Sequence, residues 1–187
     1  MSLGIILIVV AAAVVLWAVA TYNRLVTLKN RAKEGWSDID VQLKRRHDLI
    51  PNLVESVKGF MGHERTLLEN ITKARAGAME AMAQGNTAEL AKTESALAGM
   101  LGKLTVAVEA YPDIKANQNM AQLMDELSDT ENKIQASRRF YNSQVRDLNT
   151  MIETAPANMI ASMFSFAKMD FFELTDASER DNVKVSF

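Results

Sequence analysis

The chain has 187 residues, which is enough for one domain or for one domain with an appendage. Its formal net charge of −2 argues against a general nucleic-acid binder, and the absence of cysteine excludes disulfides, thiolate nucleophiles and zinc–cysteine sites. Two histidines exclude a His-rich metal site, while only 8 glycines and 3 prolines favour long helices over a many-stranded β fold.

The first segment, residues 3–20, reads LGIILIVVAAAVVLWAVA and carries no charge. Its length reaches the lower limit for a helix that crosses a bilayer. Trp17 and Tyr22 lie near its end, where amphipathic aromatic side chains prefer the membrane interface. A cleaved signal peptide is the alternative, because Ala18-Val19-Ala20 resembles a cleavage site. Since no basic side chain precedes the apolar run, we expect a retained anchor over residues 1–23.

Basic residues follow this segment and none precedes it. The first is Arg24, which we expect at the membrane interface, and Lys29, Arg31 and Lys33 come next. The positive-inside bias therefore predicts that the N-terminus lies outside and that the remaining chain lies in the cytoplasm.

An apolar stripe with a seven-residue repeat continues from the span into the following helix. A 3.6-residue helix drifts slowly against such a repeat, so one face of a long helix or coiled coil stays apolar. Small residues at the start of the stripe also favour self-association in the membrane. Only Arg46 breaks the small-or-apolar rule. The stripe consists of Gly4, Ala11, Ala18, Leu25, Ala32, Ile39, Arg46, Leu53 and Phe60.

Three more amphipathic helices are predicted: one from Gly62 to Gly85, one over 87–111 and one over 114–153. Asn86 and Glu89 form an N-cap pair before the second of these. Each helix carries one apolar face and is unstable alone, so the helices are expected to pack together. The sequence therefore predicts an all-α fold, with an antiparallel, four-helix-bundle-like domain over residues 24–155.

The C-terminal part has two segments. Residues 156–174 are rich in Met and Phe and amphipathic if helical; we expect them to cap the bundle, and the alternative is that they lie on the bilayer. Residues 175–187 form a polar tail that ends in alternating apolar side chains, Val185 and Phe187. Such an end could add to a sheet edge of a partner protein. The alternatives are docking onto its own bundle, recognition by a membrane protease, or a tail that packs locally or has no role.

Two long stretches resemble the signature of the LemA family: residues 36–64 (WSDIDVQLKRRHDLIPNLVESVKGFMGHE) and residues 126–152 (ELSDTENKIQASRRFYNSQVRDLNTMI). One departure is Phe164-Ser165-Phe166, where the family often has Phe-Gly-Phe. The resemblance implies a bacterial single-span protein of the cell (inner) membrane with a cytoplasmic helical bundle. It implies no established enzymatic activity, so no catalytic residue is carried over.

The stretch around Lys44, Arg45 and Arg46 places three cations just before Pro51, which should kink or end the helix. The first turn then falls either at Pro51 or at Gly59–Gly62, and a break at Pro51 would put His47 and the cations at a helix C-terminus. Arg46 lies on the apolar stripe, and a buried guanidinium needs a carboxylate. We expect Glu131 to supply it in a structural polar network. The alternative is an anion or lipid-headgroup site at Lys44–Arg46.

The remaining candidate sites are weak. His63-Glu64 lacks the second histidine of a zinc protease motif. We therefore predict no catalytic residue, no metal, no cofactor, no nucleic acid and no small-molecule substrate. The expected function is a non-enzymatic membrane scaffold or adaptor that contacts lipids and either self-associates or holds other membrane proteins. The alternative is a sensor that recognises an anion or an anionic headgroup.

Overall fold

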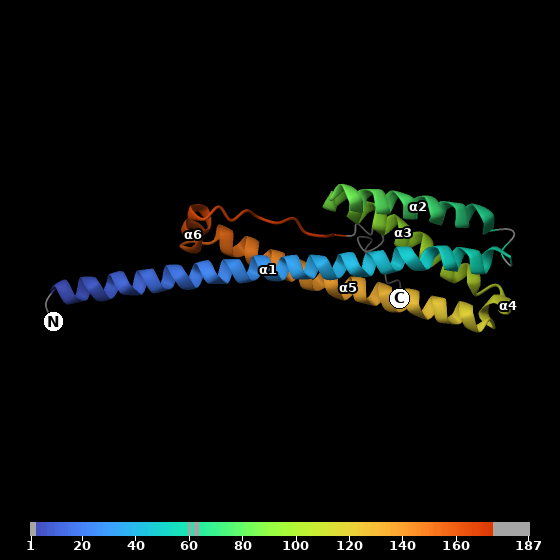
Figure 1. The fold of residues 1–187 in the computed structure, drawn as a ribbon, viewed down its shortest axis with the longest axis horizontal. Helices are drawn as coiled ribbons and strands as arrows, with labels where there is room; N and C mark the ends of the chain where they lie inside the picture. The colour runs from blue at the N-terminus through green and yellow to red at the C-terminus, as the bar shows by residue number, and fades with distance from the viewer. Residues whose placement is uncertain (1–2, 60, 62–63, 174–187) are drawn as a thin grey trace, which may run out of the picture. The chain divides into compact units, whose positions relative to one another are not determined.

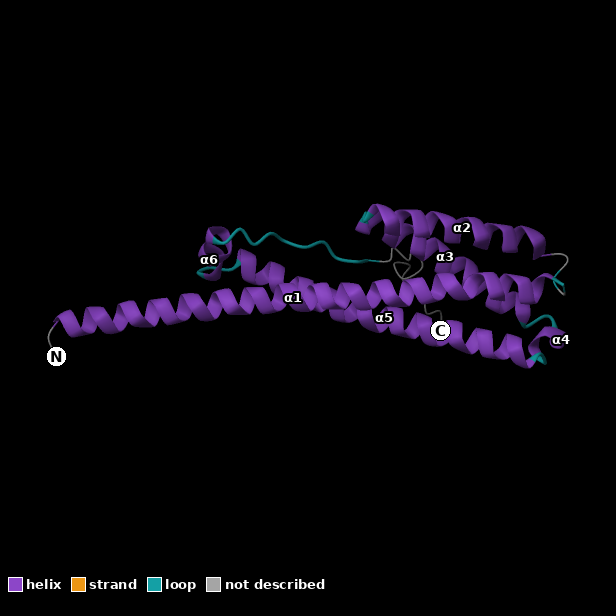
Figure 2. Cartoon of the chain, viewed as in Figure 1, coloured by secondary structure: helices purple, strands orange, loops and turns teal. Residues whose placement is uncertain are grey.

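The computed structural model describes residues 3–59, 61 and 64–173 (Figure 1). Over these residues it contains helices and loops and no strand (Figure 2), which confirms the predicted all-α fold. The polar tail and its Val185 and Phe187 lie outside the described residues. The helices are α1 (Leu3–Lys58), α2 (Arg65–Gln84), α3 (Thr87–Val108), α4 (Pro112–Lys115), α5 (Gln118–Glu153) and α6 (Ala157–Met163).

The chain divides into two compact units. The first contains the N-terminal residues through Ile39 together with Ala136–Phe171. The second contains Asp40–Gln135 together with Phe172 and Glu173. Each unit therefore takes one segment of α1 and one segment of α5.

In the first unit, the start of α1 is long and apolar enough to cross a membrane, and none of that apolar window is buried inside the protein. A core helix of a soluble protein would bury such a window. Burial begins further along the helix, where α1 meets α5 and α6. The core cluster there consists of Leu25, Leu28, Leu148, Ile160 and Ala161.

Gly35 marks a close approach of α1 and α5 in the first unit. A Cβ atom at this position would lie 2.9 Å from Phe140 Cδ1 and 3.1 Å from the backbone Cα of Tyr141. Both separations are shorter than ordinary carbon contacts. The absence of a side chain at Gly35 therefore lets the two helices pack here, and the adjacent Trp36 and Tyr141 rings lie 5.4 Å apart.

The segment after α5 is helical only over Ala157–Met163, so the amphipathic pattern of residues 156–174 does not form one helix. Helix α6 ends in a Schellman motif: Phe166 N–H donates to Ala161 O at 2.9 Å, and Ser165 N–H donates to Ser162 O at 3.2 Å. Ser165 has a φ of 55°. This left-handed conformation favours glycine, so the serine occupies a position where the glycine of Phe-Gly-Phe would fit better.

Residues 166–171 continue without regular structure and are held by α5. The Asn149 amide donates to Met169 O at 2.8 Å and accepts from Met169 N–H at 3.0 Å. The Tyr141 hydroxyl donates to Asp170 O at 2.8 Å. Burial, and then the charge of Asp170, raise the pKa of Tyr141, so the hydroxyl stays protonated as a donor. Lys168 also pairs with Glu153.

In the second unit, α2 and α3 lie side by side as a helical hairpin (Figure 1). Gly85 ends α2 with a φ of 67°, and the Asn86 side chain accepts the Glu89 N–H at 3.1 Å to begin α3. The prediction of one helix over 114–153 was wrong at its start. Asn117 Oδ1 accepts from the N–H groups of Asn119 and Met120, so a new N-cap separates α4 from α5.

Candidate functional site

The second unit contains a buried cluster of charges around Arg46 of α1. The Arg46 side chain is almost fully buried, on the apolar stripe that the sequence indicated. Its Nη1 lies 2.5 Å from Glu131 Oε2 on α5, and its Nη2 pairs with Glu94 on α3. The structure thus brings Arg46 and Glu131 together and adds a second carboxylate. One guanidinium joins three helices by charge-assisted hydrogen bonds.

Glu94 completes this cluster. Its side chain is buried, and its Oε1 lies 2.8 Å from Nε2 of His47. Burial alone would raise the pKa of Glu94, but the hydrogen bond from His47 and the charge of Arg46 outweigh burial and hold the pKa below its usual value. Glu94 therefore stays ionised at neutral pH.

Sequence reasoning missed Glu94, although the signal was present. Leu90, Glu94, Leu97 and Leu101 are spaced by four, three and four residues, so Glu94 lies on the apolar face of α3. Arg46 interrupts the stripe of α1 in the same way. Two opposite charges that each interrupt an apolar face are candidates to pair with one another, because a buried charge requires a partner.

Pro51 does not end the helix, which was one of its two predicted effects. It lies inside α1, which continues to Lys58, so the chain does not turn at Pro51. The cations and His47 are therefore not at a helix C-terminus. Proline has no N–H, and so it leaves the carbonyl of His47, four residues earlier, without its helical partner. Arg75 Nε of α2 donates to that carbonyl at 2.7 Å.

Lys44 and Arg45 are exposed, unlike Arg46. Arg45 lies 3.7 Å from Asp129 and 4.0 Å from Glu126, both on α5. Of the three cations predicted to contact an anion or headgroup, Arg46 is buried and already paired with Glu94 and Glu131. An anion contact at Lys44 and Arg45 stays a prediction, in which the two acids beside Arg45 would compete with the ligand.

The residues predicted at the membrane interface lie on α1 in the first unit. Trp17 and Arg24 are exposed. Tyr22 contacts the segment that follows α6: its ring centroid lies 4.7 Å from that of Phe164 and 5.9 Å from that of Phe166.

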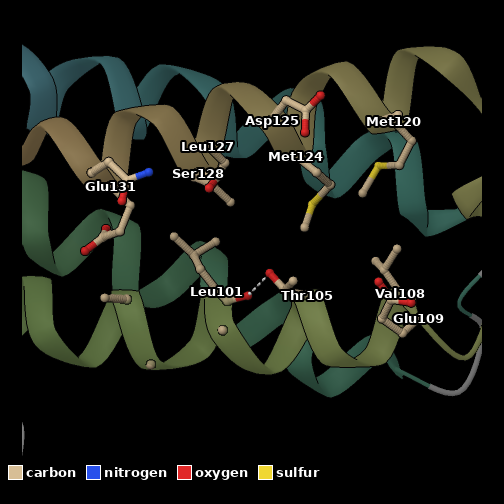
Figure 3. A pocket seen from close by; sticks show the side chains of 15 residues that line it. Leu101, Thr105, Val108, Glu109, Met120, Met124, Asp125, Leu127, Ser128 and Glu131 are labelled. Atoms are coloured by element: carbon tan, nitrogen blue, oxygen red, sulfur yellow. Dashed lines mark hydrogen bonds between the residues drawn. The ribbon is translucent and has the colours of Figure 1, made fainter.

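A groove of about 540 Å³ runs between α3 and α5 in the second unit. Figure 3 shows Leu101, Thr105 and Val108 of α3 facing Met120, Met124 and Leu127 of α5. The lining of the groove includes four small residues and three carboxylates. The small residues are Ala98, Gly99, Gly102 and Ala121, and the charged residues of the lining are Glu109, Asp125 and Glu131.

Glu131 belongs to both the groove and the buried cluster. One of its oxygens is held by Arg46, while its side chain remains 32% exposed. The cluster therefore fixes the position of one acidic group of the groove. Within residues 3–59, 61 and 64–173, no group of three or more His, Asp or Glu side chains is arranged to hold a metal ion.

Residues 35–187 match the LemA family. The chain is 28% identical to Protein LemA of Metamycoplasma hominis, and the match covers 87% of this chain and 72% of that protein. It is 23% identical to Magnetosome protein MamQ of Magnetospirillum gryphiswaldense and 24% identical to Magnetosome protein MamQ 2 of Paramagnetospirillum magneticum. Those two matches cover 84% of this chain, which spans 66% of the length of each MamQ protein.

The family match covers most of the chain, including both stretches that carry the resemblance to LemA. The apolar part of α1 lies before the matched region, and none of its residues is buried inside the protein. The chain is a membrane-associated protein and belongs to the LemA family.

Proposed function

We propose that this protein is a non-enzymatic, membrane-anchored scaffold that docks a helix of another membrane protein, or of a second copy of itself, in the groove between α3 and α5. The observation that carries the proposal is the pair of glycines in the wall of the groove. A Cβ atom added at Gly99 or at Gly102 would meet no atom within 4 Å.

Glycine inside a helix costs about 0.5–1 kcal/mol relative to alanine, because glycine loses more conformational freedom on folding. Gly35 has an internal reason for this cost, since α5 packs against it. Gly99 and Gly102 are exposed and have no such neighbour. Their lack of a side chain is useful where the backbone of a docked helix approaches closely.

The charges of the groove select the partner. All three charged residues that line it are acidic, with Glu131 already paired to Arg46, and the lining also includes the apolar side chain of Met124, which is half-buried. An amphipathic helix with basic residues beside its apolar face matches this combination. The anchor of α1 would hold the groove at the membrane, where the helices of membrane proteins are concentrated.

A photo-crosslinking residue at Thr105 tests this proposal in cells, because Thr105 lines the groove. Val106, the next residue on α3, is exposed but does not line the groove, so it supplies the matched control. We expect position 105 to capture a basic amphipathic helix or a second copy of the chain, and position 106 to capture far less. Equal capture at both positions, or no capture at either, would contradict docking in the groove.

A further inference from the structure

Helix α6 presents one apolar face to the core and a second apolar face to its surroundings. Ile160 and Ala161 are buried against Leu25 and Leu28 of α1. On the other side, Met159 is 69% exposed and Met163 is 73% exposed, and Phe164 follows with 53% exposure. A seven-residue helix that serves only as a cap would need the first face alone.

The exposed face adjoins the membrane span. Ala18, which belongs to the uncharged run of residues 3–20, packs against the same cluster that holds Ile160 and Ala161. Tyr22, just past that run, contacts Phe164. When the apolar part of α1 lies in a bilayer, α6 is therefore at the level where the hydrocarbon ends and the headgroups begin.

The sequence around α6 suits this position. No charged residue occurs from Thr154 to Ala167. Glu153 and Lys168 flank this uncharged stretch and pair with one another, so the charges at its base are neutralised. The cations that an interfacial segment requires come from α1: Arg24 is exposed, and Lys29 Nζ lies 5.7 Å from the Phe166 ring centroid.

We propose that residues 154–167 insert the outer face of α6 into the lipid interface and give the protein a second membrane contact beside its span. Met159, Met163 and Phe164 enter the boundary between headgroups and acyl chains. Arg24, Lys29 and Lys168 remain at headgroup level. This contact sets the tilt and rotation of the first unit relative to the bilayer, which a single span leaves free.

The absence of cysteine in the natural chain allows a site-specific test. Met163→Cys and Val106→Cys are matched positions, because both native side chains are 73% exposed. Each full-length variant is nitroxide-labelled and reconstituted into phosphatidylcholine–phosphatidylglycerol vesicles. Collision rates of the label with oxygen and with a water-soluble nickel chelate then give its depth. We expect the label at 163 to lie about 5–10 Å into the boundary between headgroups and acyl chains, and the label at 106 to lie in water.

Two results would overturn the proposal. If the label at 163 meets the nickel chelate as often as the label at 106 does, the α6 face is in water. If the label at 163 is shielded from both reagents and its spectrum shows spin–spin broadening, a second copy of the chain covers the face instead of lipid. Circular dichroism of both variants, matching that of the native chain, excludes misfolding as the cause.

Discussion

The two units of this protein fill their interiors differently, although both use α1 and α5. In the first unit no charged side chain of the described residues is buried, and its core cluster consists of Leu25, Leu28, Leu148, Ile160 and Ala161. In the second unit the same stripe of α1 carries Arg46, with Glu94 and Glu131 around it. Two apolar helix faces can shift slightly along one another and still pack. A fully buried ion pair does not allow such a shift, because its hydrogen bonds would be lost. We infer that the buried charges fix the register of three helices and that the first unit depends on shape and on lipid.

The largest expected effect in this comparison comes from removing the central charge of the second unit. Arg46→Met leaves Glu94 buried without its cation and should lower the free energy of unfolding by about 3–5 kcal/mol. Urea unfolding followed by circular dichroism measures this loss. The neighbouring Arg45→Ala, on an exposed pair, should cost at most about 1 kcal/mol. If both variants lower the free energy of unfolding by similar amounts, the buried cluster contributes no more to stability than the exposed pair.

The first unit should be sensitive to shape instead. In Gly35→Ala, the new methyl group collides with Phe140 and with the backbone of Tyr141. We expect a cost of about 1–3 kcal/mol from overpacking, offset in part by the better helix propensity of alanine. Gly77→Ala is the control, since nothing lies within 4 Å of its added Cβ, and it should stabilise the protein. A stabilised Gly35→Ala variant would contradict the close approach of α1 and α5.

Acid should weaken the second unit through Glu94. The folded-state pKa of Glu94 lies below its usual value of 4.5, so the unfolded chain takes up the proton first as pH falls. The stability that Glu94 contributes is therefore complete above pH 4.5 and is lost as pH falls through the folded-state pKa. Glu94→Gln should flatten the pH dependence of the free energy of unfolding in that range. A variant with an unchanged slope below pH 4.5 would show that Glu94 is not the titrating group.

A smaller effect is expected at the end of α6. Ser165→Gly removes the cost of a left-handed conformation and should raise stability by about 1 kcal/mol. Ser162→Gly, three residues earlier and inside the helix, should lower stability by about 0.5–1 kcal/mol. Thermal unfolding measures both changes in stability, which should have opposite signs. A Ser165→Gly variant that is less stable than the native chain would contradict the Schellman motif.

Much of the fold could be predicted from the sequence, because the helices are long and their apolar spacing is regular. The end of α2 at Gly85 and the N-cap of α3 at Asn86 could be predicted from the residue types alone. The break at Asn117 was not anticipated, since an isolated asparagine within a periodic stretch carries little signal by itself. The early end of α6 at Met163 was not anticipated either, because position 165 carries a serine and not the glycine that would signal a left-handed turn.

The charged cluster could be predicted only in part. The position of Arg46 on an apolar stripe required a buried carboxylate, and Glu131 was a candidate from the second long stretch. Glu94 could have been found in the same way, because a carboxylate on the apolar face of α3 requires a buried cation. The role of Pro51 depended on Arg75 of another helix, which donates to the carbonyl that proline leaves free. Such a long-range hydrogen bond has no local sequence signal.

The docking groove is tested most directly by one pair of measurements on Gly102→Ala. An added methyl group protrudes into the groove and meets nothing inside the protein. The free energy of unfolding should therefore rise by about 0.5–1 kcal/mol, because alanine favours the helix. Partner capture from position 105 should fall, because the methyl group blocks close approach of the docked helix. Gly77→Ala on α2 should give the same rise and leave capture unchanged. Gly102→Ala with undiminished capture would contradict the proposal that the α3–α5 groove holds a partner helix.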